Sequence, residues 1–308
     1  MKSLFKQAFM PTPGGQMPGT AGVEEVYAAI EEAAALLNVP CSRDTVGPIL
    51  TAFAPFEGGV IFSASAGERH AGDLDLTIQV PRRIADPYAH ALANGFLEKT
   101  DHPVGSLLSD LHERCSIDEY LIDFGVVGGF NKVYVHFPRD VQSVSQLAAV
   151  PSIPPALAEN AGFFARHGLD DVAMIAIDYR NRTTNLYFQV PGIEPKVILS
   201  MLQELGLPEP EQELLESAGK TFRVYVTLGW DSSKIERISF ARSLDLPVIQ
   251  ARVEPEIKRF VTGTPYTYEG ERFSISIVKW SPDGEWFNVG SYYQFGPLQW
   301  EVLRKILR

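Results

Sequence analysis

The chain has 308 residues, and 45% of them are hydrophobic, which is enough to bury a sizeable core. Its formal net charge of −11 argues against a nucleic-acid surface, which would need a basic stripe. No apolar run approaches the roughly 18 residues of a membrane-spanning helix. The two cysteines, Cys41 and Cys115, are too few for a disulfide framework or a zinc site. We therefore expect a monomeric cytoplasmic protein that binds neither nucleic acid nor a membrane.

The first 20 residues differ in composition from the rest of the chain. They are rich in proline and glycine and lack the continuous apolar core of a signal peptide. We predict a disordered leader at residues 1–20. No composition shift or long linker divides residues 21–308, which we predict to be a single domain.

The first strong segment of the domain is a helix. Apolar residues recur at three- and four-residue spacing across residues 23–37, which predicts an amphipathic helix. Two strand-like runs, 59–65 and 73–80, follow, and the glycine-rich stretch 66–72 joins them. These segments make one unit of a helix followed by a β-hairpin.

The same kind of unit recurs four more times along the chain. Helical sequence is predicted at 86–115, 154–168, 196–219 and 253–262. Strand pairs follow at 118–126 and 130–137, 171–179 and 183–190, 221–228 and 234–242, and 272–280 and 285–293. A last helix begins near residue 297. Five units therefore supply ten strands.

The strands alternate between an apolar and a polar face. In residues 73–80, Leu74, Leu76, Ile78 and Val80 share one face, and Asp73, Asp75, Thr77 and Gln79 share the other. The helices need an apolar surface to pack on, so we place them outside and the polar faces inside. Closing the sheet also removes its edges. The predicted fold is α+β, a ten-stranded antiparallel β-barrel surrounded by helices and enclosing a cavity. An open sheet with one solvated face is the alternative.

The polar faces carry residue types that suit a pocket. They include Lys132, Arg223 and Arg237, the carboxylates of Asp73 and Asp75, and the tyrosines at 134, 187, 225 and 292. Lysine and arginine, with Asn185 as a neutral donor, suit a phosphate-bearing ligand. Asp73 and Asp75 lie two apart on a strand, point the same way and suit Mg²⁺. Tyrosine faces stabilise a carbocation. Each feature alone is common, but together they describe ionisation of an allylic diphosphate inside a barrel.

Several segments also resemble one protein family. DLDLTIQV (73–80), VGGFNKVYVHFP (127–138), DYRNRTTNLYF (178–188) and VYVTLGWDSSKIERISFA (224–241) are similar to the soluble bacterial aromatic prenyltransferases of the ABBA barrel family. The members that prenylate naphthalene- and naphthoquinone-type polyketides are the most similar. The resemblance begins near residue 22. It implies a ten-stranded barrel that transfers a prenyl group, geranyl or dimethylallyl, from an allylic diphosphate to an aromatic polyketide-like acceptor by electrophilic substitution.

The resemblance also implies roles for particular residues. Asp75 matches a carboxylate that contacts Mg²⁺, and Thr77 matches a hydroxyl that supports it. The matched diphosphate contacts are Lys132, Asn185, Tyr225 and Arg237. The matched aromatic wall is Tyr134, Tyr187 and Tyr292. Further matched positions in the acceptor and prenyl pocket are Ile61, Met174, Phe222, Ala241 and Gln299. We expect Lys132 and Arg237 to act in catalysis on the leaving group, and the three wall tyrosines to act on the cation.

The sequence departs from the family pattern at two positions. Asn288 stands where a lysine often binds the diphosphate. We therefore expect one cationic contact with the diphosphate to be weakened or to be supplied by another residue, with Arg182 as a candidate. Arg223 stands where close relatives have a small polar residue. We interpret it as an acceptor determinant that pairs with a carboxylate or phenolate; pairing with an acidic group inside the barrel is the alternative. Because Asp75 and Thr77 are kept, we expect Mg²⁺ dependence, with metal-independent turnover left open.

The residues do not identify a base for the final proton loss. Two other functions stay open from the sequence. One is a non-catalytic barrel that binds a hydrophobic small molecule, which would have no need of interior cations. The other is hydrolysis of the same diphosphate by water that reaches the cation.

Overall fold

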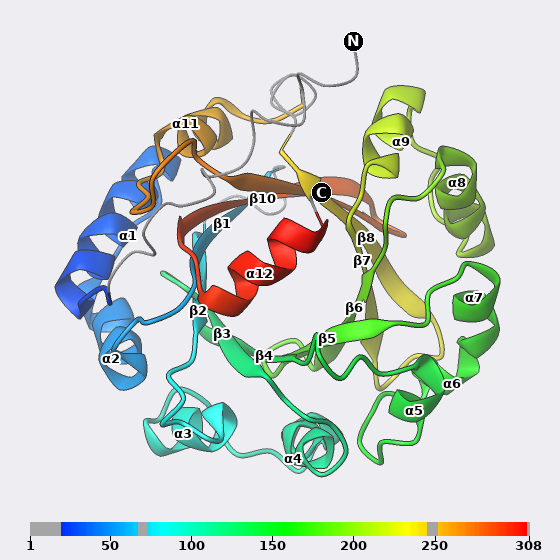
Figure 1. Ribbon diagram of the computed structural model, residues 1–308, viewed down its shortest axis with the longest axis horizontal. Helices are drawn as coiled ribbons and strands as arrows, with labels where there is room; N and C mark the ends of the chain where they lie inside the picture. Colours follow the sequence, from blue (N-terminus) through cyan, green and yellow to red (C-terminus); the bar gives the residue numbers. More distant parts are fainter. Residues whose placement is uncertain (1–19, 67–72, 245–251, 307–308) are drawn as a thin grey trace.

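The structure, a computed structural model, describes residues 20–66, 73–244 and 252–306 (Figure 1). Apart from residue 20, the predicted leader lies outside the described residues. So does most of the glycine-rich stretch 66–72. Side chains are described as far as Leu303.

The described residues form ten strands that close into one antiparallel barrel. Each strand pairs with the next in the sequence, and the pairing of the first with the last closes the circle. The strands are β1 (Val60–Ala66), β2 (Asp75–Gln79), β3 (Glu119–Gly125), β4 (Gly129–His136), β5 (Val172–Asp178), β6 (Thr183–Gln189), β7 (Arg223–Gly229), β8 (Ile235–Ser243), β9 (Ser274–Ser281) and β10 (Gly284–Gln294). The predicted barrel is confirmed, and the alternative of an open sheet is wrong.

Helices surround the barrel (Figure 1). They are α1 (Val23–Leu37), α2 (Arg43–Phe53), α3 (Pro87–Ala93), the 3-10 helix η1 (Pro103–Gly105), α4 (Leu107–His112), α5 (Val144–Ala148), α6 (Ala156–Glu159), α7 (Ala161–Arg166), α8 (Pro195–Glu204), α9 (Gln212–Gly219), α11 (Pro255–Gly263) and α12 (Pro297–Ile306). The helix predicted at 23–37 is confirmed with the same bounds. The helical sequence predicted at 86–115 is divided among α3, η1 and α4.

Helix α2 was not predicted from the sequence. Pro48 lies inside it, where proline removes one backbone hydrogen bond. The helix forms because Ser42 caps its first turn by accepting a hydrogen bond from the Asp44 amide. It also buries Ile49, Leu50 and other apolar residues. Packing therefore outweighs the local cost of the proline.

The hydrophobic core lies between the barrel and the helices. The largest fully buried side chains include Phe62, Phe124 and Phe240, which belong to strands and point outward. Phe164 on α7 stacks on Phe188 of β6 with ring centroids 5.5 Å apart. Burial of these apolar surfaces is the main driving force for folding. Because this core lies outside the barrel, the inward-facing residues are available to form a cavity.

Helix α12 lies across one end of the barrel (Figure 1). Its residues Gln299, Val302 and Leu303 line the cavity beneath it. Helix α12 thus distinguishes this end of the barrel from the other. We call the end that α12 covers the helix end.

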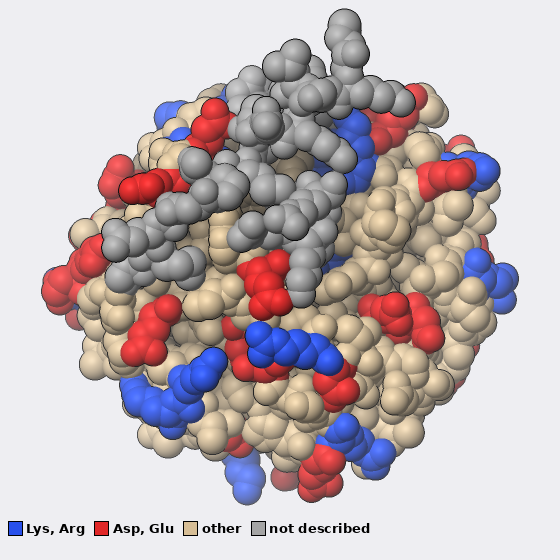
Figure 2. Space-filling view, viewed as in Figure 1, with Lys and Arg blue, Asp and Glu red and all other residues tan. Residues whose placement is uncertain are grey.

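The outer surface at the helix end carries charges of both signs. Figure 2 shows acidic and basic side chains interspersed in small groups over the described part of this face. No helix among residues 20–66, 73–244 and 252–306 is long and apolar enough to cross a membrane.

Candidate active site

The barrel encloses a cavity of about 560 Å³, which all ten strands and α12 line. This volume lies in the usual range for small-molecule sites. Apart from Asp73 and Arg182, every site residue predicted from the sequence lines it. The lining includes Ile61, Asp75, Thr77, Lys132, Tyr134, Met174, Asn185, Tyr187, Phe222, Arg223, Tyr225, Arg237, Ala241, Asn288, Tyr292 and Gln299.

Arg182 lies elsewhere. It occupies the turn between β5 and β6 with a left-handed φ of 52°, and its side chain is exposed. The cavity contains a different additional cation, Lys279 on β9. The structure therefore places Lys279, and not Arg182, among the inward-facing basic residues.

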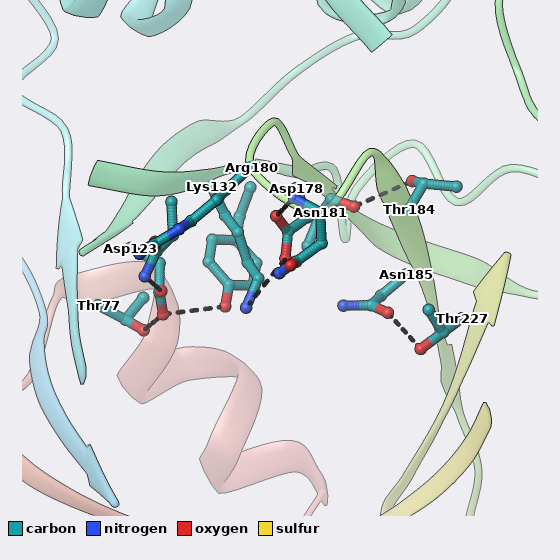
Figure 3. Close-up of polar contacts among 12 residues, drawn as sticks. Thr77, Asp123, Lys132, Asp178, Arg180, Asn181, Thr184, Asn185 and Thr227 are labelled. Carbon is teal, nitrogen blue, oxygen red and sulfur yellow. Dashed lines mark hydrogen bonds and ion pairs between the residues drawn. The ribbon is translucent and has the colours of Figure 1, made fainter. Parts of the chain in front are cut away.

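Acidic and basic side chains gather at the end of the barrel opposite α12, which we call the polar end. Lys132 on β4 lies 3.6 Å from a carboxylate oxygen of Asp178 on β5, the residue directly across the sheet (Figure 3). Burial lowers the pKa of Lys132, but Asp123, Asp178 and Asp75 outweigh burial and raise it above its ordinary value. Lys132 is therefore a permanent cation at neutral pH.

Asp123 on β3 connects several of these groups. Its Oδ2 accepts hydrogen bonds from the Thr77 hydroxyl at 3.2 Å and from the Tyr134 hydroxyl at 3.4 Å (Figure 3). Its Oδ1 accepts one from the Asn131 amide at 3.4 Å. Burial, followed by the charge of Asp123, raises the pKa of Asp75 to about 7, while Lys132 opposes that rise. The two carboxylates thus repel each other in the absence of a further cation.

Asn185 on β6 presents a hydrogen-bond donor to the cavity. Its Oδ1 accepts a 2.6 Å hydrogen bond from the hydroxyl of Thr227, its partner on β7 (Figure 3). A hydroxyl donates to the amide oxygen and not to the amide NH₂, so this contact sets the orientation of the side chain. The NH₂ group is left for an anion inside the barrel.

Two more cations complete the polar end. Arg237 on β8 lies with its guanidinium 5.7 Å from the ring centre of Trp286. Burial lowers the pKa of Arg237, which still stays charged because an arginine loses its proton only at very high pH. Burial, followed by Arg237 and Lys132, lowers the pKa of Lys279 to about 7. Nearby cations and burial therefore outweigh the acidic groups around Lys279 in the free protein.

Asp73 does not share this site, contrary to the sequence interpretation. Strand β2 begins at Asp75, and Asp73 precedes it. The Asp73 carboxylate accepts backbone hydrogen bonds from Val127 at 3.1 Å and Gly128 at 3.0 Å in the β3–β4 turn. It approaches Gly125 so closely that a Cβ there would lie 2.2 Å from its oxygen. Asp73 therefore holds a turn and is not available to a metal.

Tyrosines form the middle of the cavity wall. The rings of Tyr187 and Tyr225 lie 4.4 Å apart, and Tyr134 lies 6.1 Å from Tyr187. Tyr292 stacks on Phe295 at 4.8 Å. Burial raises the pKa of all four tyrosines, so they are neutral at physiological pH. Neutral aromatic faces suit a cationic intermediate.

Arg223 lies beyond the tyrosines, toward the helix end. Its guanidinium is 5.9 Å from the ring centre of Phe222, and no described acidic side chain forms an ion pair with it. Phe222 directly precedes β7 and lines the cavity, in agreement with the pocket position that the family resemblance implies. The alternative that Arg223 pairs with an acidic group inside the barrel finds no support among the described residues.

The sequence interpretation missed five functional candidates. They are Asp123, Asp178, Lys279, and the pair of Glu119 and His136. Alternation along the strands 118–126, 171–179 and 272–280 would have found the first three, because each lies an even number of residues from another inward-facing position. The cross-strand contacts among them depend on the register, which a single sequence does not supply.

Comparisons with known proteins identify the family of this chain. The family model described as aromatic prenyltransferase Orf2 matches residues 21–299. A 5,10-dihydrophenazine-1-carboxylate 9-dimethylallyltransferase from Streptomyces anulatus is 42% identical, over 91% of this chain and 96% of the relative. A flaviolin linalyltransferase from Streptomyces virginiae is 40% identical, over 91% and 95%. A furaquinocin biosynthesis prenyltransferase from a Streptomyces strain is 41% identical, over 91% and 94%.

A solved structure shares the fold. It is a 6-dimethylallyl tryptophan synthase with a TM-score of 0.55 and 13% identity, covering 91% of this chain and 99% of the other. At that identity the likeness supports the barrel architecture alone. The family match and the relatives at 40–42% identity cover most of the chain. The chain belongs to the Orf2 family of aromatic prenyltransferases and is itself an aromatic prenyltransferase.

Proposed function

We propose that the polar end binds an allylic diphosphate with Mg²⁺, and that the acceptor is a fused-ring aromatic compound with an acidic substituent near Arg223. One observation carries this proposal. A single cavity has cations at the polar end, neutral tyrosines along its middle and an arginine without a described ionic partner toward the helix end. This order matches the order of charges along an allylic diphosphate and an anionic acceptor.

The diphosphate would meet four donors at the polar end. Lys132 and Arg237 supply charge, and Asn185 supplies its oriented NH₂ group. Lys279 would supply the positive charge that Asn288 lacks. The partner of Asn288 on β9 is Ile277, and Lys279 follows two residues later on the same inward face. Donors fixed before the reaction stabilise the charge that develops on the leaving group, which is commonly the largest catalytic contribution.

The residues around Asp75 fit a magnesium ion. Burial, followed by the charge of Asp123, raises the pKa of Asp75, and a divalent cation would offset both effects. Mg²⁺ prefers one or two carboxylates together with substrate phosphates and water. Asp75 would hold the ion, with Thr77 and Asp123 beside it. The ion would supply positive charge to the diphosphate as its bond to carbon breaks.

The tyrosines would protect the allylic cation. When the carbon–oxygen bond of the donor breaks, positive charge spreads over the allylic carbons. Tyr134, Tyr187 and Tyr225 present aromatic faces and keep water away from those carbons. An electron-rich ring carbon of the acceptor then forms the new bond. Hydrolysis of the donor is the competing outcome, which the closed wall opposes.

The acceptor assignment follows from Arg223. A guanidinium forms paired hydrogen bonds with a carboxylate and binds phenolates well. Names of two relatives mention a dihydrophenazine carboxylate and flaviolin. The donor is geranyl or dimethylallyl diphosphate, and the similarity to naphthoquinone-type members favours geranyl.

A product assay tests the proposal. The protein is incubated with dimethylallyl or geranyl diphosphate and a panel of hydroxynaphthalenes, hydroxynaphthoquinones and phenazine carboxylates, with Mg²⁺ or EDTA. We expect prenylated product, the highest kcat/KM for acidic acceptors and a large loss with EDTA. Release of diphosphate without prenylated product would refute the proposed transfer. An EDTA-insensitive rate would refute the metal assignment alone.

A further inference from the structure

A buried histidine–glutamate pair lies in the barrel wall and has no role in the chemistry described above. His136 on β4 and Glu119 on β3 are directly opposite each other in the sheet. His136 Nδ1 lies 2.8 Å from Glu119 Oε1, and their side chains are only 5% and 6% exposed. His136 lines the barrel cavity, two residues beyond Tyr134 on the same inward face.

The contact with Glu119 determines which nitrogen of His136 can accept a proton. An ionised carboxylate accepts a hydrogen bond from Nδ1–H, which leaves the lone pair on Nε2. Nε2 is buried and has no hydrogen-bond partner among the described residues. Buried polar atoms are nearly always hydrogen-bonded, so an unpartnered one beside a cavity points to a ligand.

The position of the pair suits the acceptor and not the diphosphate. Along β4, Lys132 lies at the polar end, Tyr134 at the tyrosine wall and His136 beyond it, toward the helix end. On the neighbouring strand the partner of His136 is Met174, and the partner of Lys132 is Asp178. His136 is thus separated from the phosphate-binding cations by the layer that would hold the allylic cation.

Glu119 also borders a second cavity. That cavity has a volume of about 550 Å³, includes Asp118 and Arg139 in its lining and borders α12. The pair therefore lies between the substrate cavity, which His136 lines, and this second cavity, which Glu119 lines. A proton that reaches His136 has a carboxylate on its other side to stabilise it.

We propose that His136 is the general base that takes the hydroxyl proton of the aromatic acceptor, with Glu119 as the positioning residue. This role rests on the proposed function. As the ring carbon forms a bond to the allylic carbon, the O–H bond of the acceptor breaks and its proton moves to Nε2. The ring electrons then form a neutral cyclohexadienone instead of a cationic intermediate. The new sp³ carbon loses its proton, the oxygen regains one, and the aromatic product and one net proton leave with diphosphate.

The test compares an acceptor that has this proton with one that lacks it. We use a dihydroxynaphthalene and its dimethyl ether with geranyl diphosphate and Mg²⁺. Glutamine in His136→Gln keeps hydrogen-bonding capacity but cannot take a proton. We expect kcat for the hydroxy acceptor to fall about 100-fold with little change in KM, since a general base typically contributes about 10²–10⁴-fold. The rate with the ether should change less than 3-fold.

A second histidine–glutamate pair provides a matched control. His167 Nε2 lies 2.9 Å from Glu204 Oε2, its side chain is 6% exposed, and it follows α7 on the outside of the barrel. His167→Gln should leave both rates unchanged. Glu119→Gln keeps a hydrogen-bond acceptor for Nδ1–H but removes the negative charge. It should therefore lower kcat with the hydroxy acceptor about 10-fold and leave kcat with the dimethyl ether unchanged. Imidazole should partly restore His136→Gly with the hydroxy acceptor only.

The outcomes separate this inference from the proposed function. Equal losses with the hydroxy acceptor and the ether in His136→Gln would overturn the base role and indicate a structural one. If that variant does not fold, the ratio of the two rates in Glu119→Gln decides in the same way. Absence of prenylated product from the wild-type protein with every acceptor overturns the proposed function and the base role with it.

Discussion

Replacing Lys279 by methionine should make the unliganded protein more stable and its diphosphate binding weaker. The lysine lies among cations inside the barrel, and burial, Arg237 and Lys132 together lower its pKa from 10.5 to about 7. Methionine has a similar length and no charge. The substitution therefore removes an unfavourable charge from the free enzyme and a favourable one from the complex.

The size of the stability change follows from the pKa of Lys279. One pKa unit corresponds to about 1.4 kcal/mol. The fall in the pKa of Lys279 from 10.5 to about 7 therefore lowers the free energy of unfolding of the wild type by at most ~5 kcal/mol below pH 7. The side chain is only half-buried and faces an open cavity, where water weakens electrostatic effects. We expect a gain of about 1–3 kcal/mol, which corresponds to a Tm increase of about 2–6 °C for a protein of this size.

The gain should depend on pH in a defined direction. Because the pKa of Lys279 is lower in the folded than in the unfolded chain, the unfolded chain binds more protons between about pH 7 and pH 10.5. Wild-type stability therefore recovers as the pH rises through that window. The difference between the variant and the wild type should be largest at or below pH 7 and smaller at pH 9, by thermal unfolding.

Binding of inorganic diphosphate with Mg²⁺ is measured by calorimetry on the same two proteins. A hydrogen bond to a charged group contributes about 1.5–3 kcal/mol, so the variant should bind roughly 10- to 100-fold more weakly. The wild type should take up a proton on binding at pH 8, seen as a dependence of the heat on the buffer, and the variant should not. A lower Tm in the variant, or unchanged diphosphate affinity, would refute the assignment of Lys279.

Four further substitutions separate neighbouring roles. Asp75→Asn should lower kcat about 10²–10³-fold and abolish the Mg²⁺ response, seen in steady-state kinetics. Asp73→Ala should instead lower the free energy of unfolding by about 1–3 kcal/mol and leave the Mg²⁺ response intact, because its carboxylate holds the β3–β4 turn. Arg223→Ser should lower kcat/KM about 10-fold only for acceptors that carry a carboxylate or a phenolate; equal loss for every acceptor would contradict a selectivity role. Thr227→Val should raise KM for the donor several-fold, because Asn185 loses the hydrogen bond that orients it.

The sequence predicted the barrel and the polar part of its cavity lining because both follow from a two-residue periodicity. Further lining positions were implied by the family resemblance alone, among them Met174, Phe222 and Gln299. Asp75, Lys132, Asn185 and Arg237 all lie where alternation placed them. Asp73 did not follow the alternation because β2 starts two residues later, and its carboxylate instead accepts hydrogen bonds from a turn far along the chain.

Other features required the three-dimensional register. The ion pair of Lys132 and Asp178 and the contact between Thr77 and Asp123 join different strands, so their spacing along the chain carries no signal. The same holds for the pair of Glu119 and His136, which lie 17 residues apart. Helix α2 was missed for a different reason, because a local helix breaker is outweighed by burial of its apolar face.

The location of the hydrophobic core outside the barrel separates the residues that stabilise the fold from the residues that contact the substrate. Phe62, Phe124 and Phe240 hold the sheet to its helices from one side, while the opposite side of the same strands meets the substrate. A change of an inward-facing residue, such as Arg223, leaves the packing between sheet and helices intact. The shape and polarity of the pocket can therefore diverge among relatives with little cost in folding, so a single architecture can supply prenyl groups to many different aromatic compounds.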